Sequence, residues 1–380
     1  MRSEDYILDN VCKEGNLKKT LVVSAVNLTE GGTLTVLREC LKVAVIDFGS
    51  EWDIVALVHD KNLIDLPTVQ CIEFPKAKRS WFRRLYYELH MFKSLSKRLK
   101  PDLWLSLHDI TPNVYARRQA VYCHNPAPFY RQTLRESMLD PTFFLFSKMY
   151  SLVYKTNIQR NHHVVVQQKW LREEFVRRYG ARNVVVAHPI DSVGNSGARA
   201  RHRGDTTVFF FPSLSRFFKN FEVICAAVAL LAAEGVSRFE VRLTIDGTEN
   251  RYSEELFKRY GTLGALRFIG RQNQAQMAIQ YAAADCLIFP SRLETWGLPI
   301  SEAKTLGIPM LVADVPYAHE TVGTYDQVRF FPATNAIGLA ALMGDFISYR
   351  LRFDYVVEAE PAAPFARDWS GLLKILTAGL

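Results

Sequence analysis

Short apolar runs and helical patterns alternate along the chain, and this alternation limits the possible folds more than any other feature. Residues 20–28 read TLVVSAVNL, a buried strand that leads into Gly31-Gly32, and the apolar spacing of a helix follows from Thr33 to Val45. The same reasoning predicts further strands at Ile54–Val58, Leu103–Leu107, Ala120–Cys123, His163–Val166 and Val184–Ala187. Strands that alternate with helices indicate a parallel sheet.

A polar stretch interrupts this pattern near the middle of the chain. Residues 189–205, PIDSVGNSGARARHRGD, have no apolar periodicity and are rich in Gly, Ser and Arg, as exposed linkers are. The pattern then begins again, with strands predicted at Thr207–Phe211, Glu240–Ile245, Leu266–Ile269, Cys286–Phe289 and Met310–Ala313 and helices near 221–234, 274–283 and 299–306. We therefore predict an α/β protein with two Rossmann-like, doubly wound domains at 1–190 and 207–358, a linker at 191–206 and a tail at 359–380.

Two such domains would enclose a cleft between the carboxyl ends of their sheets, where open α/β sheets bind ligands. The chain has no Gly-x-Gly and no Gly-x-x-x-x-Gly-Lys, which disfavours a nicotinamide enzyme or an ATPase. It also has no Asp-x-Asp, so no acidic pair for a divalent metal is visible, and we expect neither a metal nor another cofactor. The six cysteines form no Cys-x-x-Cys pair and are interpreted as buried, reduced thiols.

The sequence contains no predicted membrane span. Its longest uninterrupted apolar run, Val223–Ala233, is well short of the roughly 20 residues that cross a bilayer. The N-terminal residues alternate in charge and lack the apolar core of a signal peptide, so we expect a cytoplasmic location.

Glu294 and Glu302 carry the strongest chemical signal of the chain. They bracket seven residues in PSRLETWGLPISEAKTLGIPMLVAD, which follows a predicted strand, and Pro299 suits the first position of a helix. This places Glu294 in a loop and Glu302 on the first turns of the helix, with the amides near Thr295–Leu298 available to an anion. Taken alone, two glutamates near a helix start are better explained as residues that only complement the helix dipole.

This segment resembles the Glu-x7-Glu signature of the retaining GT-B-fold glycosyltransferases of family 4, including bacterial enzymes of surface-polysaccharide and O-antigen synthesis. The resemblance covers most of the C-terminal half and includes the preceding Pro-Ser, Gly297-Leu298-Pro299 and the Glu-Ala at 302–303. It implies that Glu294, with Thr295 and Trp296 beside it, contacts the donor sugar, and that Glu302 contacts the ribose. It also implies that Ile269 and Arg271 hold the base, and that the C-terminal tail can cross back to the first domain.

A second matching element is FFFPSLSRFFKN, residues 209–220. In the family a basic pair at this point binds the donor diphosphate, and here Lys219 and Arg216 take that place, although the common Gly-Arg-Leu is Pro-Ser-Leu at 212–214. Such cations would neutralise the diphosphate without a metal. The alternative interpretation is that Lys219 and Arg216 are ordinary solvated cations on the surface. Further candidates for the diphosphate are the backbones of Gly31, Gly32, Gly297 and Leu298.

His124, in VYCHNPAPF at the end of a predicted strand, resembles the histidine that the family places beside the reacting sugar. A lone histidine is more often structural, so its position within the resemblance is what makes it a candidate. The resemblance further implies retention at the anomeric carbon, and on that basis we assign His124 and Glu294 to catalysis of the transfer of a hexose or deoxyhexose from a GDP-, UDP- or dTDP-sugar. No covalent nucleophile is assigned.

Nearly all of the net charge lies in one short stretch. Between Lys76 and Lys100 nine Lys or Arg residues accompany one acid, Glu88, which gives +8, the formal net charge of the whole chain. In this stretch Phe82, Leu85, Leu89, Phe92 and Leu99 form one predicted helical stripe, with the basic side chains Arg83, Arg84, Lys97 and Arg98 largely off it. This arrangement suits an anionic membrane surface, although a packed helix with a solvated face is the simpler alternative.

Membrane contact would favour a glycan or lipid-linked acceptor, and a peripheral location at the inner face of the cell membrane. Two other classes compete with this hypothesis. Some nucleotide-sugar epimerases share the architecture, and an inactive relative could dock on membrane or RNA. RNA binding would spread basic residues over a groove with stacking aromatics, whereas here they occupy one stretch, so no nucleic-acid partner is expected.

Overall fold

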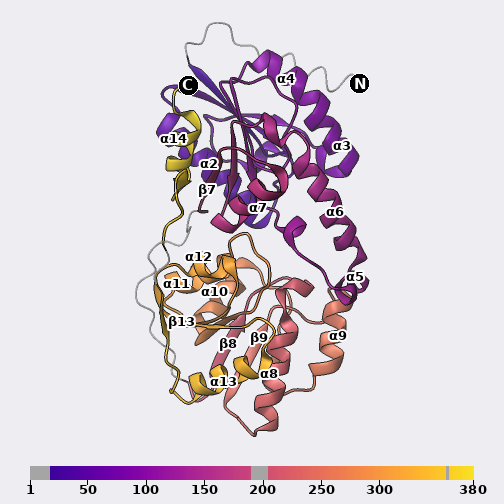
Figure 1. Ribbon diagram of the computed structural model, residues 1–380, viewed down its shortest axis with the longest axis vertical. Coiled ribbons are helices and arrows are strands. Elements are labelled where there is room, and N and C mark those ends of the chain that lie inside the picture. The colour runs from indigo at the N-terminus through magenta and orange to yellow at the C-terminus, as the bar shows by residue number, and fades with distance from the viewer. Residues whose placement is uncertain (1–17, 190–203, 357–358) are drawn as a thin grey trace. The chain divides into compact units, whose positions relative to one another are not determined.

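The computed structural model describes residues 18–189, 204–356 and 359–380 (Figure 1). Cys12 and most of the predicted linker lie outside these ranges. The described chain divides into two compact units. Of the described residues, unit 1 contains 18–129, 146–189 and 361–380. Unit 2 contains 130–145, 204–356 and 359–360.

Unit 1 is built on a parallel sheet. Its strand order is β15-β7-β6-β5-β4-β1-β2-β3, and the strand pairs formed by the described residues are all parallel. The predicted strands of this half are present, together with two short ones that the patterns missed, β3 and β15. The bounds are β1 Lys19–Ser24, β2 Trp52–Val58, β3 Gln70–Glu73, β4 Leu103–Ser106, β5 Arg118–Cys123, β6 His163–Val166, β7 Val184–Ala187 and β15 Phe365–Ala366.

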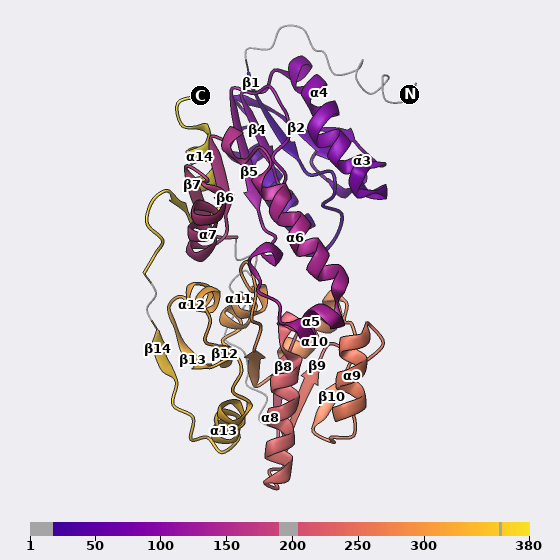
Figure 2. The ribbon, with the colours of Figure 1, turned by 45° about the vertical axis from the view of Figure 1, so that its right-hand side comes forward.

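Helices cover both faces of this sheet because alternate strand residues point to opposite sides (Figure 2). Leu21 and Val23 pack on the face of α2 (Gly31–Phe48) and α14 (Trp369–Thr377), whereas Val22 packs on the opposite face with residues of α4. That opposite face also carries α3 (Trp81–Tyr86), η3 (Tyr87–Met91), α4 (Phe92–Leu99), the later part of α6 (Pro141–Lys155) and α7 (Lys169–Tyr179).

Unit 2 has a second sheet, of order β10-β9-β8-β11-β12-β13-β14, which is parallel except that β14 runs antiparallel to β13. Phe209 and Phe211 of β8 contact rings of α13 and α8, and Phe210 contacts Tyr281 of α10 on the other face. The strands are β8 Thr207–Phe211, β9 Phe239–Leu243, β10 Leu266–Phe268, β11 Cys286–Phe289, β12 Met310–Ala313, β13 Tyr325–Phe331 and β14 Asp354–Val356. The helices are α5 Leu134–Leu139, α8 Phe221–Ala233, α9 Arg251–Tyr260, α10 Gln274–Ala283, α11 Leu298–Thr305, α12 Pro316–Val322 and α13 Ala336–Ile347.

Two segments join a unit whose other residues lie far from them in the sequence. The tail joins unit 1, where Phe365 pairs with Val186 of β7 and the carbonyl oxygen of Leu376 accepts a hydrogen bond of 3.1 Å from Arg118 Nη1. Conversely, Tyr130–Leu145 joins unit 2, which differs from the predicted division at residue 190.

The basic stretch does not form the single helical stripe that its spacing predicts. Helix α3 passes into the π-helical turn η3 before α4, and this wider turn changes the phase of the side chains after it relative to those before it, so the two groups do not share one face. Phe82, predicted to be buried, is 83% exposed, and Arg84, predicted on the outer face, is buried. Within the described residues, no helix is both long and apolar enough to span a bilayer.

Candidate functional site

Lys219 and Glu294 meet at the carboxyl end of the unit 2 sheet. Lys219 ends the short turn after β8, and Glu294 lies in the loop between β11 and α11. The Lys219 Nζ atom lies 2.5 Å from Glu294 Oε1, and the side chains are only 18% and 15% exposed. The pair thus places a cation with three donors and a carboxylate with two acceptors side by side at the ends of neighbouring strands.

Gly297 forms the entry to α11 directly after Glu294. Its φ of +91° is in the left-handed region, and a Cβ atom there would lie 3.4 Å from the Phe289 ring, so another residue would be strained. The first N–H groups of any helix lack partners within the helix and favour an anion, which makes this turn with Leu298 suitable for a phosphate. The indole of Trp296 is buried and donates to Ser301 Oγ at 2.9 Å, and the Trp296 carbonyl oxygen accepts from the Thr321 hydroxyl.

Glu302 lies on α11 and accepts a short hydrogen bond from the Tyr281 hydroxyl of α10. Burial raises the pKa of Glu302, and the hydrogen bond from Tyr281 partly lowers it again. Burial and the Glu302 charge raise the pKa of Tyr281, so this hydroxyl remains a donor. The second glutamate of the motif is therefore held in a fixed direction, with one side occupied by Tyr281.

Arg216, the other member of the predicted basic pair, contacts a different acid, Asp140. Its guanidinium lies 3.3 Å from Asp140 Oδ2, and the side chain is 51% exposed. Ile269 and Arg271 flank Gly270 beyond β10, where the Ile269 carbonyl oxygen accepts from Gln272 Nε2 at 2.8 Å. Glu294, Glu302, Lys219, Arg216 and the residues at 269–271 thus all belong to unit 2, at the carboxyl ends of its strands or on the helices that follow.

His124 belongs to unit 1 and follows β5. Its backbone N–H donates to Asp109 Oδ1 at 2.6 Å, and its ring Nε2 lies 3.5 Å from Asp109 Oδ2. Asp109 is nearly buried, has a φ of +71° and also accepts from Asn125 N–H and the hydroxyls of Tyr150 and Tyr154. Asp109 therefore fixes the segment that carries His124.

The other predicted site residues of unit 1 are two glycines and four basic residues, which differ in their exposure. Gly31 and Gly32 are exposed at the first turn of α2, and a Cβ atom at Gly31 would meet nothing within 4 Å. Arg83, Lys97 and Arg98 are exposed. Arg84 instead stacks on the Trp81 ring and donates to the His108 carbonyl oxygen at 2.7 Å, so it is not available to a membrane.

Close to Arg84, Glu88 and His108 form a buried titratable pair that the sequence did not indicate. Glu88 Oε1 lies 3.1 Å from His108 Nε2, and both side chains are fully buried. Burial raises the pKa of Glu88 to about 8, against the opposing effect of the Arg84 charge. Burial, and then the Arg84 charge, lower the pKa of His108. Both groups are therefore held in their neutral forms near pH 7.

Sequence reasoning missed Asp109, Tyr281 and Arg292. Each one contacts a candidate residue or its neighbour: Asp109 accepts from His124 N–H, Tyr281 donates to Glu302, and Arg292 N–H donates to the carbonyl oxygen of Phe218, next to Lys219. The one available signal was for Asp109, an aspartate two residues after the predicted strand Leu103–Leu107. Among the described residues, no group of His, Cys, Asp or Glu side chains is arranged to hold a metal ion.

Comparison with known proteins shows which family the segment that carries this site matches. Residues 197–356 match the family model of the glycosyl transferases group 1. The chain is 32% identical over 106 residues to the O-antigen chain mannosyltransferase B of Escherichia coli, a match that covers 28% of each chain. It is 22% identical over 305 residues to the O-antigen chain mannosyltransferase RfbU of Salmonella typhimurium, which covers 76% of this chain and 78% of RfbU.

Solved structures agree in fold. WaaG, a glycosyltransferase involved in lipopolysaccharide biosynthesis, superposes with a TM-score of 0.64 at 13% identity, over 86% of this chain and 90% of WaaG. Anabaena Alr3699/HepE in complex with UDP-glucose superposes with a TM-score of 0.56 at 15% identity, over 87% of this chain and 90% of HepE. The chain thus has the two-domain α/β fold of the GT-B glycosyltransferases, and its residues 197–356 match the model of the glycosyl transferases group 1 family.

Proposed function

We propose that this protein transfers a hexose or deoxyhexose from a nucleotide-diphosphate sugar to a glycan acceptor, with retention of configuration. The observation that carries the proposal is the Lys219–Glu294 pair, with Glu294 in the loop that leads into α11 and Glu302 on that helix. A nucleotide-diphosphate sugar needs a cation and amides for its phosphates, and carboxylates for the vicinal hydroxyls of its two sugars.

Donor binding would divide the Lys219–Glu294 pair between two parts of the ligand. The ammonium turns to the diphosphate and stabilises the charge that develops on it as the sugar departs, together with Arg216 and the amides at Gly297 and Leu298. Glu294 then accepts from the donor sugar, and Glu302 from the ribose. No protein nucleophile is needed if the departing phosphate takes the proton of the acceptor hydroxyl on the same face of the sugar.

The relatives' names bear on the acceptor. Two are O-antigen chain mannosyltransferases and one takes part in lipopolysaccharide biosynthesis, so we extend the proposal to a lipid-linked glycan acceptor. The donor base stays open among uracil, guanine and thymine. The test is to incubate the protein with UDP-, GDP- and dTDP-sugars and lipid-linked glycan, and to determine the anomeric configuration of the product by NMR. Inversion would refute the retaining mechanism, and a changed nucleotide sugar without acceptor would indicate an epimerase.

Nucleotide affinity should depend on pH through Glu302. Because the pKa of this buried carboxyl is raised, it becomes protonated as the pH falls below that value, and a neutral carboxyl is the poorer acceptor for the ribose. Tyr281→Phe removes the hydrogen bond that stabilises the carboxylate, so the loss should begin at higher pH. Calorimetric titration of nucleoside diphosphate from about pH 5 to about pH 8 checks this. The control is Tyr349→Phe on the exposed surface, and identical profiles for the two variants would contradict the assignment.

A membrane surface would meet unit 1 on α3, α4 and α6. Phe82 and Leu152 are 83% and 67% exposed, and α3 and α6 are neighbours through the Trp81 and Tyr150 rings, 5.8 Å apart. With the exposed cations Arg83, Lys97 and Arg98 they combine apolar side chains with positive charge, which suits an anionic bilayer.

We expect the triple replacement of Arg83, Lys97 and Arg98 by serine to weaken binding to anionic vesicles about 100-fold, since each cation near the surface contributes about 1 kcal/mol. Co-sedimentation with phosphatidylglycerol and phosphatidylcholine vesicles measures it. The matched control replaces Arg251, Lys258 and Arg259 of α9. Equal recovery on both lipids, unaffected by the triple replacement, would exclude the membrane partner.

A further inference from the structure

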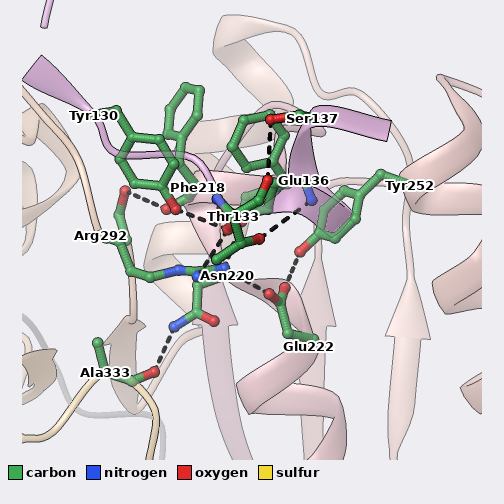
Figure 3. Close-up of polar contacts among 12 residues, drawn as sticks. Tyr130, Thr133, Glu136, Ser137, Phe218, Asn220, Glu222, Tyr252, Arg292 and Ala333 are labelled. Atoms are coloured by element: carbon green, nitrogen blue, oxygen red, sulfur yellow. Dashed lines mark hydrogen bonds and ion pairs between the residues drawn. The ribbon is translucent and has the colours of Figure 1, made fainter. Parts of the chain in front are cut away.

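Arg292 lies two residues before Glu294 and reaches across to the loop that carries Lys219 (Figure 3). Its Nη1 donates to Glu136 Oε1 at 3.0 Å, and its Nη2 donates to Glu222 Oε1 at 2.7 Å and to the Phe217 carbonyl oxygen at 3.1 Å. The side chain is 23% exposed. A mostly buried guanidinium between two carboxylates is held in one direction by its planar fork of donors.

The backbones of the two loops are joined at the same place. Arg292 N–H donates to the Phe218 carbonyl oxygen at 2.8 Å, directly before Lys219. Directly after Lys219, the Asn220 side chain donates to the carbonyl oxygens of Pro290 and Ala333 at 3.0 and 2.7 Å. Lys219 is thus bracketed by contacts to the loop of Glu294.

Glu136 is itself fixed before it meets Arg292. It closes a capping box with Thr133 at the start of α5 and accepts from the Tyr130 hydroxyl at 2.9 Å. The rings of Tyr130 and Phe143 pack on those of Phe217 and Phe218, with centroids 5.3 to 6.0 Å apart. The segment from Tyr130 to Leu145, which lies in the first half of the sequence, therefore supports the loop of Lys219.

From these contacts we infer that Arg292 and Glu136 form a clamp that sets the spacing of Lys219 and Glu294, so that Arg292 is a positioning residue for the donor. Neither residue belongs to the Glu-x7-Glu pair, and neither needs to touch the ligand. The inference rests on the proposed function, because it takes the Lys219–Glu294 pair as the donor site. A shift of the two loops by a fraction of an ångström would separate the diphosphate contact from the sugar contact.

The two acids make the clamp sensitive to the loss of its cation. Glu136 is only 9% exposed, and Glu222, at 42% exposed, is held by a short hydrogen bond that it accepts from the Tyr252 hydroxyl. Without the guanidinium they would repel each other across the space that it fills. Arg292→Met should therefore push the β8–α8 and β11–α11 loops apart, while Arg292→Lys keeps the charge and loses the fork.

The test measures loop order and ligand binding separately. Hydrogen–deuterium exchange of the ligand-free protein is followed in peptides that cover residues 212–220 and 290–298, and UDP, GDP and dTDP are titrated by calorimetry. The variants are Arg292→Met, Arg292→Lys and Glu136→Gln. The matched control is Arg242→Met of β9, whose side chain is 24% exposed and pairs with Glu240 in the same unit.

We expect Arg292→Met to speed exchange in both peptides and to weaken the preferred nucleotide at least about tenfold. Arg292→Lys should recover part of this affinity, Glu136→Gln should lie between the wild type and Arg292→Met, and the control should change neither quantity. Exchange and affinity equal to wild type in Arg292→Met and Glu136→Gln would overturn the clamp. Wild-type protein that binds none of the nucleotides, while exchange responds as expected, would overturn the proposed function instead.

Discussion

Lys219→Ala is expected to lower kcat/KM for the nucleotide sugar by about 100- to 1000-fold, the loss typical of a donor aimed at charge that develops in the transition state. Lys219 Nζ contacts Glu294 directly, so the change also leaves a carboxylate that is only 15% exposed without its cation. Two effects therefore act in the same direction: the diphosphate loses its neutralising charge, and the adjacent carboxylate repels it.

Initial rates over a range of donor concentration measure this loss. Lys258→Ala serves as the control, because Lys258 also pairs with a glutamate at 2.5 Å but lies on the exposed surface of α9. A loss of less than about fivefold in Lys219→Ala, or an equal loss in the control, would remove Lys219 from the donor site.

Asp109→Asn is expected to destabilise unit 1 by about 3 kcal/mol, since a hydrogen bond to a charged group contributes about 1.5 to 3 kcal/mol and several are affected. The buried carboxylate accepts from two backbone N–H groups and two tyrosine hydroxyls. Asparagine tolerates the left-handed backbone of this position, so the change tests the carboxylate and not the turn. An amide group, however, presents N–H donors where a carboxylate oxygen accepts.

Chemical denaturation compares this variant with Asp345→Asn, which alters a more exposed ion pair with Arg350 on unit 2. Turnover should also fall, because Asp109 holds the backbone of His124. A variant as stable as the wild type would show that these contacts are dispensable, and full activity would separate His124 from Asp109.

Local patterns were sufficient for the parts of the site that lie close together in sequence. Glu294, Gly297 and Glu302 fall within one strand-turn-helix unit, so period, glycine and proline positions predicted their places. Lys219 follows a strand that pairs with β11, and a parallel sheet brings such strand ends to one edge.

The errors and omissions arose where a longer-range contact decides. Arg84 is buried because it donates to the carbonyl oxygen of His108, 24 positions away, and the π-helical turn η3 changes the phase between Phe82 and the later residues of the predicted stripe. Tyr130–Leu145 joins unit 2 through Glu136 and Arg292, which are 156 positions apart. A pattern with a period of a few residues contains no information on a pairing at that separation.

The central claim, that unit 2 binds a nucleotide-diphosphate sugar through the Glu-x7-Glu segment, is tested most directly by calorimetry. Wild-type protein and Glu302→Ala would each be titrated with UDP, GDP, dTDP and the matching diphospho-sugars. We predict that the wild type binds one nucleotide with micromolar affinity. In the variant this binding should be weaker by at least about 1.4 kcal/mol, which is tenfold. No binding of any of them, or equal binding to both proteins, would contradict the claim.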